Sequence, residues 1–282
     1  MNVKHKLLRP AGELKKQVAA AAGQLAELVY PPDIYCISCG KAIPSGRLYS
    51  MCDCCLDTIH WANGKLCAAC GKPLEDWYPD RYCSECIGQE RSFDGGITCF
   101  QYKEQEREMI RNLKYHGKGF LARPLSEIMA DRLNALPGRW DLVIPVPMYR
   151  KKERKRGYNQ ADLLARFMAR RMDLAYSRKV LIRTRDTAPM NRLGAEERRR
   201  NLDHAFAVTE EGRSMIRGRR LLLVDDIFTT GTTAGRCAEV LKEAGSGPVT
   251  LLSLAAGRNQ RELPQISAIS ETGGTLKEKN SL

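Results

Sequence analysis

The sequence lacks any long apolar run. None of its apolar stretches approaches the roughly 20 residues that a bilayer-spanning helix needs, and charged residues interrupt the apolar ones near the N-terminus. There, Leu14, Val18 and Leu25 have the spacing of an amphipathic helix rather than of a signal-peptide core. We therefore predict a docking helix over residues 1–30, no transmembrane segment and a cytoplasmic protein.

Acidic residues are scarce relative to basic ones. The 282 residues include 46 Lys and Arg against 33 Asp and Glu, which gives a formal net charge of +13. An excess of this sign favours polyanionic partners, namely nucleic acid, phosphorylated metabolites or an acidic membrane surface. It leaves the fold undetermined.

Cysteine is almost absent outside one short segment. Nine of the 11 cysteines lie between Cys36 and Cys86, and eight of them form four C-x-x-C pairs. The pairs are Cys36/Cys39, Cys52/Cys55, Cys67/Cys70 and Cys83/Cys86. Adding 31 to the first four positions gives the last four, so the module is an internal repeat. The ninth cysteine, Cys54, breaks the period and is interpreted as a spare thiol.

The spacing of these pairs predicts structural zinc. Two cysteines separated by two residues reach one ion from a tight knuckle, in which Gly40 and Gly71 let the chain turn back. Two knuckles supply the four thiolates of a tetrahedral site, with no open position left for catalysis. We predict two zinc ions over residues 31–90, with sequential and crossed pairing both open. A disulfide cluster is disfavoured in a reducing compartment.

From Phe93 onward, apolar runs alternate with helical spacing. The runs that have the composition of strands lie at 97–100, 141–147, 180–182, 221–224 and 249–255. Helical spacing follows several of them, including a helix capped by Asn159 and one from about Thr233 to Ala244. This order predicts an α/β domain over 91–258, with a mostly parallel sheet and helices on both faces. The polar tail at 259–282 is expected to be disordered.

One segment of this domain combines groups that suit a sugar phosphate. The apolar strand at 221–224 delivers Asp225 and Asp226 to its carboxyl end, where ligands bind in such sheets. Hydroxyl groups and a glycine follow as a helix begins; these residues are Thr229, Thr230, Gly231, Thr232 and Thr233. Free N–H groups at a helix start suit a phosphate, glycine lets the anion approach closely, and paired carboxylates suit ribose hydroxyls or Mg²⁺.

The segment from Leu221 to Thr233 closely resembles the phosphoribosyl pyrophosphate (PRPP) motif of type I phosphoribosyltransferases. The resemblance implies that the acidic pair holds the ribose hydroxyls of Mg²⁺-bound PRPP and that residues 229–233 hold its 5′-phosphate. It also implies a pyrophosphate site after the strand at 141–147. The residues there are Pro147, Arg150 and Lys151.

The whole arrangement resembles the ComF family of competence-related proteins, which includes GntX-like members. In that family a cysteine-rich zinc module precedes a phosphoribosyltransferase domain. The R-G-Y-N-Q stretch at 156–160 is similar to the family's marks, as is the R-x-x-N-x-x-x-A-F stretch that contains Arg198 and Asn201. The polar stretch at 187–206 is similar to the flexible hood loop that closes over PRPP. One departure is Met190, where many members carry glutamine.

Two functions of different classes fit these observations. In the first, the protein transfers phosphoribosyl from Mg-PRPP to a nitrogenous acceptor, while Arg150 and Lys151 neutralise the departing pyrophosphate. In the second, a non-catalytic protein senses PRPP or a nucleotide and binds single-stranded DNA through its basic surface and zinc module. The resemblance implies a part in DNA uptake, with competence-machinery proteins as partners. The sequence names neither the acceptor nor the oligomeric state.

Overall fold

The computed structural model describes residues 34–88, 90–115, 117–186, 202 and 204–257. The predicted N-terminal helix and the polar tail lie outside the described residues. So do Met190, Arg198 and Asn201 of the predicted hood loop. Within the described ranges, no helix is both long enough and apolar enough to cross a bilayer.

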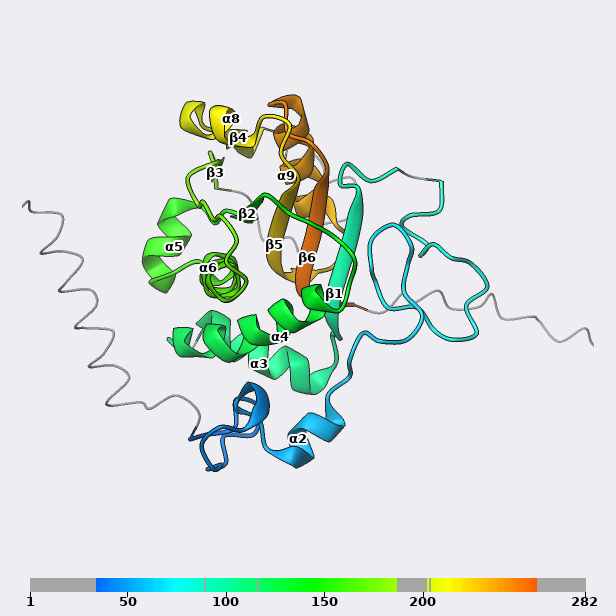
Figure 1. Cartoon of the computed structure of the whole chain (residues 1–282), viewed down its shortest axis with the longest axis vertical. Helices are drawn as coiled ribbons and strands as arrows, with labels where there is room; N and C mark the ends of the chain where they lie inside the picture. The colour runs from blue at the N-terminus through cyan, green and yellow to red at the C-terminus, as the bar shows by residue number, and fades with distance from the viewer. Residues whose placement is uncertain (1–33, 89, 116, 187–201, 203, 258–282) are drawn as a thin grey trace, which may run out of the picture.

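A four-stranded parallel sheet forms the centre of the molecule (Figure 1). Its strands follow the order β1-β6-β5-β2, and each neighbouring pair is parallel. Their bounds are β1 Gly95–Gln101, β2 Leu142–Pro145, β5 Leu221–Phe228 and β6 Val249–Ala256. Tyr176 adds an isolated parallel bridge to Val143 of β2. The predicted mostly parallel sheet is confirmed, and the connections between its strands are long enough for the crossovers that parallel pairing requires.

Helices cover both faces of the sheet (Figure 1). Three helices lie on one face and α9 lies on the other; their bounds are α3 Glu104–Tyr115, α4 Ala122–Asn134, α6 Gln160–Arg171 and α9 Thr232–Glu243. Leu222 and Val224 of β5 join the core with α3, α4 and α6, whereas Leu221 and Leu223 join the core with α9. Residues 221–224 of β5 are all apolar because both faces of the sheet are buried, so side chains on either face need an apolar environment.

A second, two-stranded sheet stands apart from the main one. It pairs β3 (Leu181–Arg183) with β4 (Phe206–Val208) in antiparallel register. The strand predicted at 180–182 is therefore confirmed as a strand, but it does not join the main sheet. In the chain, β3 follows α6, and β4 precedes the short helix α8 (Glu210–Ile216). Another short helix, α5 (Arg150–Arg156), precedes α6 and ends at Gly157, which has a φ of +93°.

The cysteine module divides into two lobes that pack on opposite sides of the sheet. The first lobe (residues 34–62) contains η1 (Leu48–Ser50) and α2 (Asp53–Thr58) and joins the core with α3 and α4. The second lobe (residues 65–93) joins the core on the α9 side. In Figure 1 the first lobe lies beside α3 and the second lies beside β1. Both lobes thus gain from the large domain the apolar core that they are too small to build alone.

Candidate functional site

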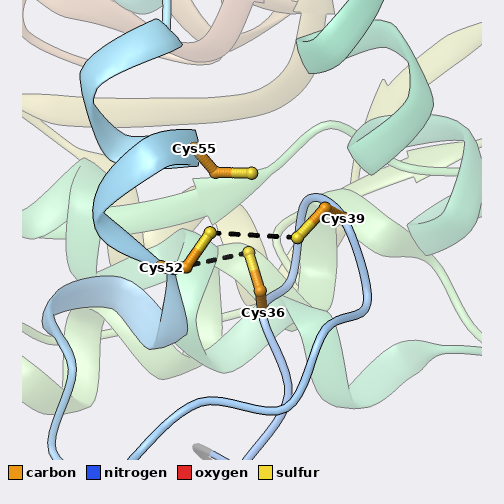
Figure 2. Close-up of side chains that lie close together, drawn as sticks. All are labelled: Cys36, Cys39, Cys52 and Cys55. Atoms are coloured by element: carbon orange, nitrogen blue, oxygen red, sulfur yellow. Dashed lines mark hydrogen bonds between the residues drawn. The ribbon is translucent and has the colours of Figure 1, made fainter.

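The eight paired cysteines form two separate quartets. The described ligand atoms of Cys36, Cys39, Cys52 and Cys55 lie within 4.8 Å of one another, as do those of Cys67, Cys70, Cys83 and Cys86. Figure 2 shows the first quartet, with Cys55 on α2 and a dashed line between Cys39 and Cys52. The Sγ atoms of Cys39 and Cys52 are 3.8 Å apart. The corresponding distance between Cys70 and Cys83 in the second quartet is 3.6 Å. The pairing is therefore sequential, which settles the choice that the sequence left open.

These distances fit a structural zinc ion in each quartet. A tetrahedral ion with Zn–S bonds of about 2.3 Å places neighbouring sulfur atoms roughly 3.8 Å apart. Four thiolates complete the coordination shell, so neither quartet offers an open position to water or a substrate. Cys54 belongs to neither quartet and is exposed.

The two knuckles repeat in their backbone as well as in their cysteines. The Gly40 amide donates to the Cys36 carbonyl and the Gly71 amide donates to the Cys67 carbonyl, each at 2.9 Å. Both glycines have a positive φ, 74° for Gly40 and 67° for Gly71, which favours glycine at these turns. The expected role of the two glycines is confirmed.

The acidic pair lies where the sheet opens between β2 and β5. The pairing of β2 with β5 ends at Pro145 and Val224, whereas β5 continues beside β6 as far as Phe228. Asp225 and Asp226 therefore follow directly after the last residue that β2 covers. This opening beside the carboxyl end of a parallel strand is the place where α/β sheets bind ligands.

The two carboxylates have different surroundings, because successive side chains of a strand point to opposite faces. Asp226 is buried on the α3 side, where its Oδ2 atom lies 2.8 Å from the Lys114 Nζ atom. Burial alone would raise the pKa of Asp226, but the Lys114 ammonium outweighs this and lowers it below the usual value. Asp225 is partly exposed, and its pKa lies well above the usual value because of desolvation and the Asp226 charge. The pair therefore consists of one ion-paired carboxylate and one that is more readily protonated.

The loop after β5 presents the start of α9. Gly231 has a φ of +81°, and the first turn of α9 closes with the Gly235 amide donating to the Gly231 carbonyl at 2.7 Å. Amides ahead of that first bond have no acceptor within the helix and can donate to an anion. The hydroxyls of Thr230 and Thr232 lie 2.9 Å apart beside them. A Cβ atom at Gly231 would lie 2.8 Å from the Phe228 ring, so the loop has no room for a side chain there.

The cysteine quartets and the loop after β5 each lie within a range of the chain that matches a known protein family. A family model of the double zinc ribbon domain matches residues 25–87, and one of the phosphoribosyl transferase domain matches residues 122–277. The chain belongs to the phosphoribosyltransferase family. The two matches confirm that a zinc module precedes the phosphoribosyltransferase domain.

Three relatives are similar to this chain in sequence over most of their own length. Competence protein F of Haemophilus influenzae is 29% identical over 218 residues, which are 71% of this chain and 94% of that protein. DNA utilization protein YhgH of Escherichia coli O157:H7 is 28% identical over 78% of this chain and 95% of its own. Competence protein ComFC of Bacillus subtilis is 25% identical over 69% of this chain and 79% of its own. These similarities confirm the predicted place of this chain in the ComF family.

Sequence reasoning missed Lys114 of the phosphoribosyltransferase domain. Its signal was present, because Lys114 follows Ile110 by four residues and so falls on the apolar stripe of α3. Burial alone would lower the pKa of Lys114, but Asp226 raises it above the usual value. A lysine on a buried helix face needs a partner, and the partner here is one of the two predicted site carboxylates.

The R-G-Y-N-Q stretch joins the end of β2 to this ion pair. The Tyr158 hydroxyl donates to the Leu113 carbonyl at 2.5 Å, next to Lys114. The Asn159 side-chain amide donates to the Val146 carbonyl at 2.9 Å, and its Oδ1 atom accepts from the Ala161 amide as the predicted cap of α6. The stretch therefore positions α3 and the end of β2 relative to each other.

The residues predicted for pyrophosphate form a second group. Pro147 and Arg150 line a cleft of about 510 Å³ together with Asn159, Arg183 and Thr209, between the end of β2 and the small sheet. Lys151 is exposed on α5 and is not among the lining residues. Residues 225–233 do not line this cleft either, so the described structure arranges the predicted site residues in two groups.

Proposed function

We propose that this phosphoribosyltransferase-family protein binds PRPP together with Mg²⁺ in the segment from Asp225 to Thr233. The observation that supports this proposal is the combination of a partly exposed carboxylate beyond the end of β2 with a side-chain-free turn at Gly231 that opens α9. A ribose 5-phosphate has a matching arrangement, since its hydroxyls and its phosphate lie at opposite ends of the sugar. The net charge of +13 favours such an anion as well.

Each part of the segment has a role in this proposal. Amides and hydroxyls of residues 229–233 hold the 5′-phosphate at the start of α9. Asp225 accepts hydrogen bonds from the ribose hydroxyls or contacts Mg²⁺, and Asp226 supports it from the buried side. Pro147, Arg150 and Lys151 hold the pyrophosphate, with Arg198 and Asn201 contributing from the hood loop.

The chemistry proposed for this site is phosphoribosyl transfer. A nitrogen lone pair of the acceptor attacks C1′ as the C1′–O bond breaks, the bonding electrons leave with pyrophosphate, and the acceptor nitrogen loses its proton to solvent. Arg150 and Lys151 neutralise the charge that develops on pyrophosphate, and the acidic pair positions the sugar. In the cell we propose a cytoplasmic role in DNA use during competence, in line with the names of the relatives.

Calorimetric titration of the zinc-loaded protein with PRPP and Mg²⁺ tests the binding proposal. Wild type should bind, and Asp225→Asn should weaken binding at least about tenfold, a loss of about 1.4 kcal/mol. Asp173→Asn, which makes the same charge change on an exposed turn, should leave the affinity unchanged. Absence of heat and of a thermal shift with wild type would exclude a PRPP site. Pyrophosphate release with a panel of bases and amines then tests transfer.

A second function is supported by the exposed surface of the second lobe. Trp77 and Tyr82 are 54% and 45% exposed, and the exposed Arg81 lies between them in the chain. Exposed aromatic rings beside basic groups suit stacking with unpaired bases, so the alternative proposal is single-stranded DNA binding. A labelled oligonucleotide should then bind at low salt and weaken steeply as salt rises, and Trp77→Ala should lower the affinity. Failure to bind at low salt rejects this alternative.

A further inference from the structure

One side chain connects the second cysteine quartet to the proposed phosphate loop. The Arg91 Nε atom donates to the Cys86 Sγ atom at 3.1 Å, and its Nη1 atom donates to the Thr230 carbonyl at 2.8 Å. The guanidinium is a planar fork with fixed donor directions, so two acceptors on different sides define its position. Arg91 therefore bridges Cys86, a predicted zinc ligand, and the backbone of the loop at residues 229–233.

The second lobe also packs against the base of the same loop. The Phe93 ring contacts the Phe228 ring edge-on, with centroids 6.1 Å apart, and Lys72 Nζ lies 5.7 Å from the centre of the Phe228 ring. Phe228 directly precedes the loop. A Cβ atom at Gly231 would meet this ring at 2.8 Å and Arg91 Nη1 at 3.0 Å. The turn at Gly231 therefore packs against Arg91, which belongs to the second lobe, and against Phe228, which the second lobe contacts through Phe93 and Lys72.

The first lobe provides an internal comparison. In the 31-residue repeat, His60 occupies the position that Arg91 occupies in the second lobe. His60 faces α3: its backbone amide donates to the Glu106 Oε1 atom at 2.8 Å, and its Nδ1 atom lies 3.1 Å from the same oxygen. Among the described contacts of His60, none reaches residues 229–233. Among the described residues, this repeat position therefore connects to the loop in the second lobe and to α3 in the first.

We propose that zinc in the second quartet holds the phosphate loop in its binding conformation through Arg91, which acts as a positioning residue. A lobe of this size owes most of its folding free energy to the metal, so loss of zinc frees Cys86 and with it the guanidinium. The Thr230 carbonyl then loses its donor and the loop at the start of α9 becomes mobile. A ligand that needs the ordered loop has to restore that order, which lowers its affinity.

This coupling rests on the proposed PRPP site for one of its consequences only. If PRPP binds the ordered loop, linkage requires PRPP to strengthen zinc binding by the same factor by which zinc strengthens PRPP binding. The effect on the loop itself does not depend on any ligand. The two consequences can therefore be measured separately.

The test compares Arg91→Gln with His60→Gln in the full-length, zinc-loaded protein. Amide hydrogen exchange should rise at residues 229–235 in Arg91→Gln and stay at the wild-type level in His60→Gln, with both variants retaining two zinc ions per chain. PRPP affinity measured by calorimetry should fall about tenfold in Arg91→Gln alone. PRPP should slow the release of one zinc ion to a chromophoric chelator in wild type and in His60→Gln, but not in Arg91→Gln.

The outcomes separate this proposal from the proposed function. Unchanged exchange and affinity in Arg91→Gln overturn the role of Arg91. If wild type does not bind PRPP, the proposed function fails, and the exchange comparison still decides whether Arg91 orders the loop. If Arg91→Gln does not fold, Arg91→Lys retains the charge without the fork and should show the same rise in loop exchange. Wild-type exchange in Arg91→Lys then rejects the proposal.

Discussion

The two cysteine lobes share one sequence pattern and differ in what surrounds it. All four cysteines of the second quartet are buried, whereas Cys39 of the first is exposed and Cys52 is half-buried. The first lobe is joined to the helix layer, for example by the Tyr49 hydroxyl, which donates to Asp131 of α4 at 3.0 Å. The second lobe reaches the loop after β5. The comparison shows that a repeat can specify the same cysteine quartet twice while each copy contacts a different part of the domain.

Loss of one zinc ligand gives the largest expected difference between the lobes. Cys83→Ser should lower the unfolding free energy by more than about 4 kcal/mol, because the second lobe loses its metal inside a buried site. Cys39→Ser should cost less, because Cys39 is exposed and the first lobe keeps its packing on α3 and α4. Denaturation in guanidinium with zinc counted per chain measures both. Equal losses would mean that the two lobes are equally integrated.

The knuckle glycines give the next largest difference. A Cβ atom on Gly71 would lie 2.2 Å from the Gly96 carbonyl oxygen of β1, whereas one on Gly40 would meet nothing within 4 Å. Gly71→Ala should therefore cost about 3 kcal/mol or more, from the collision and the positive φ together. Gly40→Ala should cost only about 1 kcal/mol, from the positive φ alone. Thermal unfolding of the zinc-loaded variants distinguishes these values, and similar costs would contradict the close approach at Gly71.

The acidic pair extends the comparison, since Asp226 faces the α3 side on which the first lobe packs. Asp226→Asn should destabilise the protein by about 3 kcal/mol at neutral pH, because Lys114 keeps a buried charge without its partner. The folded pKa of Asp226 is lowered, so this stabilisation is present above the unfolded pKa of about 3.9 and is lost as the pH falls below it. Denaturation curves across pH measure the loss. Lys114→Met in the Asp226→Asn background should recover part of it; no recovery would remove Lys114 as the cause.

Substitution of Asp225 should change the unfolding free energy least, and in the opposite direction from substitution of Asp226. Its folded pKa is raised, so its contribution to stability is favourable below the unfolded pKa and is lost as the pH rises through the folded value. Asp225→Asn should therefore stabilise the ligand-free protein by about 1 kcal/mol at pH 8 and have little effect in acid. The same titration implies that PRPP affinity of wild type rises with pH. A destabilised Asp225→Asn at pH 8 would show that the Asp226 amide, which donates to Asp225 Oδ1 at 2.8 Å, outweighs the desolvation of the carboxylate.

Much of the fold could be predicted from local patterns. The apolar runs that became β1, β2, β5 and β6 are each too long and too apolar to be exposed, and the helix capped by Asn159 has the predicted cap. The sequence predicted a strand at 180–182 but not the sheet that it joins, because a strand of three residues does not specify its pairing partner. Lys114 and Arg91 were missed, because each acquires its role from a partner more than 100 residues away in the chain.

The sequence alone indicated the metal chemistry and the motif of the loop after β5, since both depend on residue types at short, regular spacing. Only the tertiary structure decided which cysteines share an ion, which carboxylate is ion-paired and which lobe contacts the loop after β5. The physical reason is that neighbours in the chain constrain one another through backbone geometry, which a sequence displays. Contacts such as those of Lys114 with Asp226 and of Arg91 with Thr230 depend instead on how the sheet brings distant segments together.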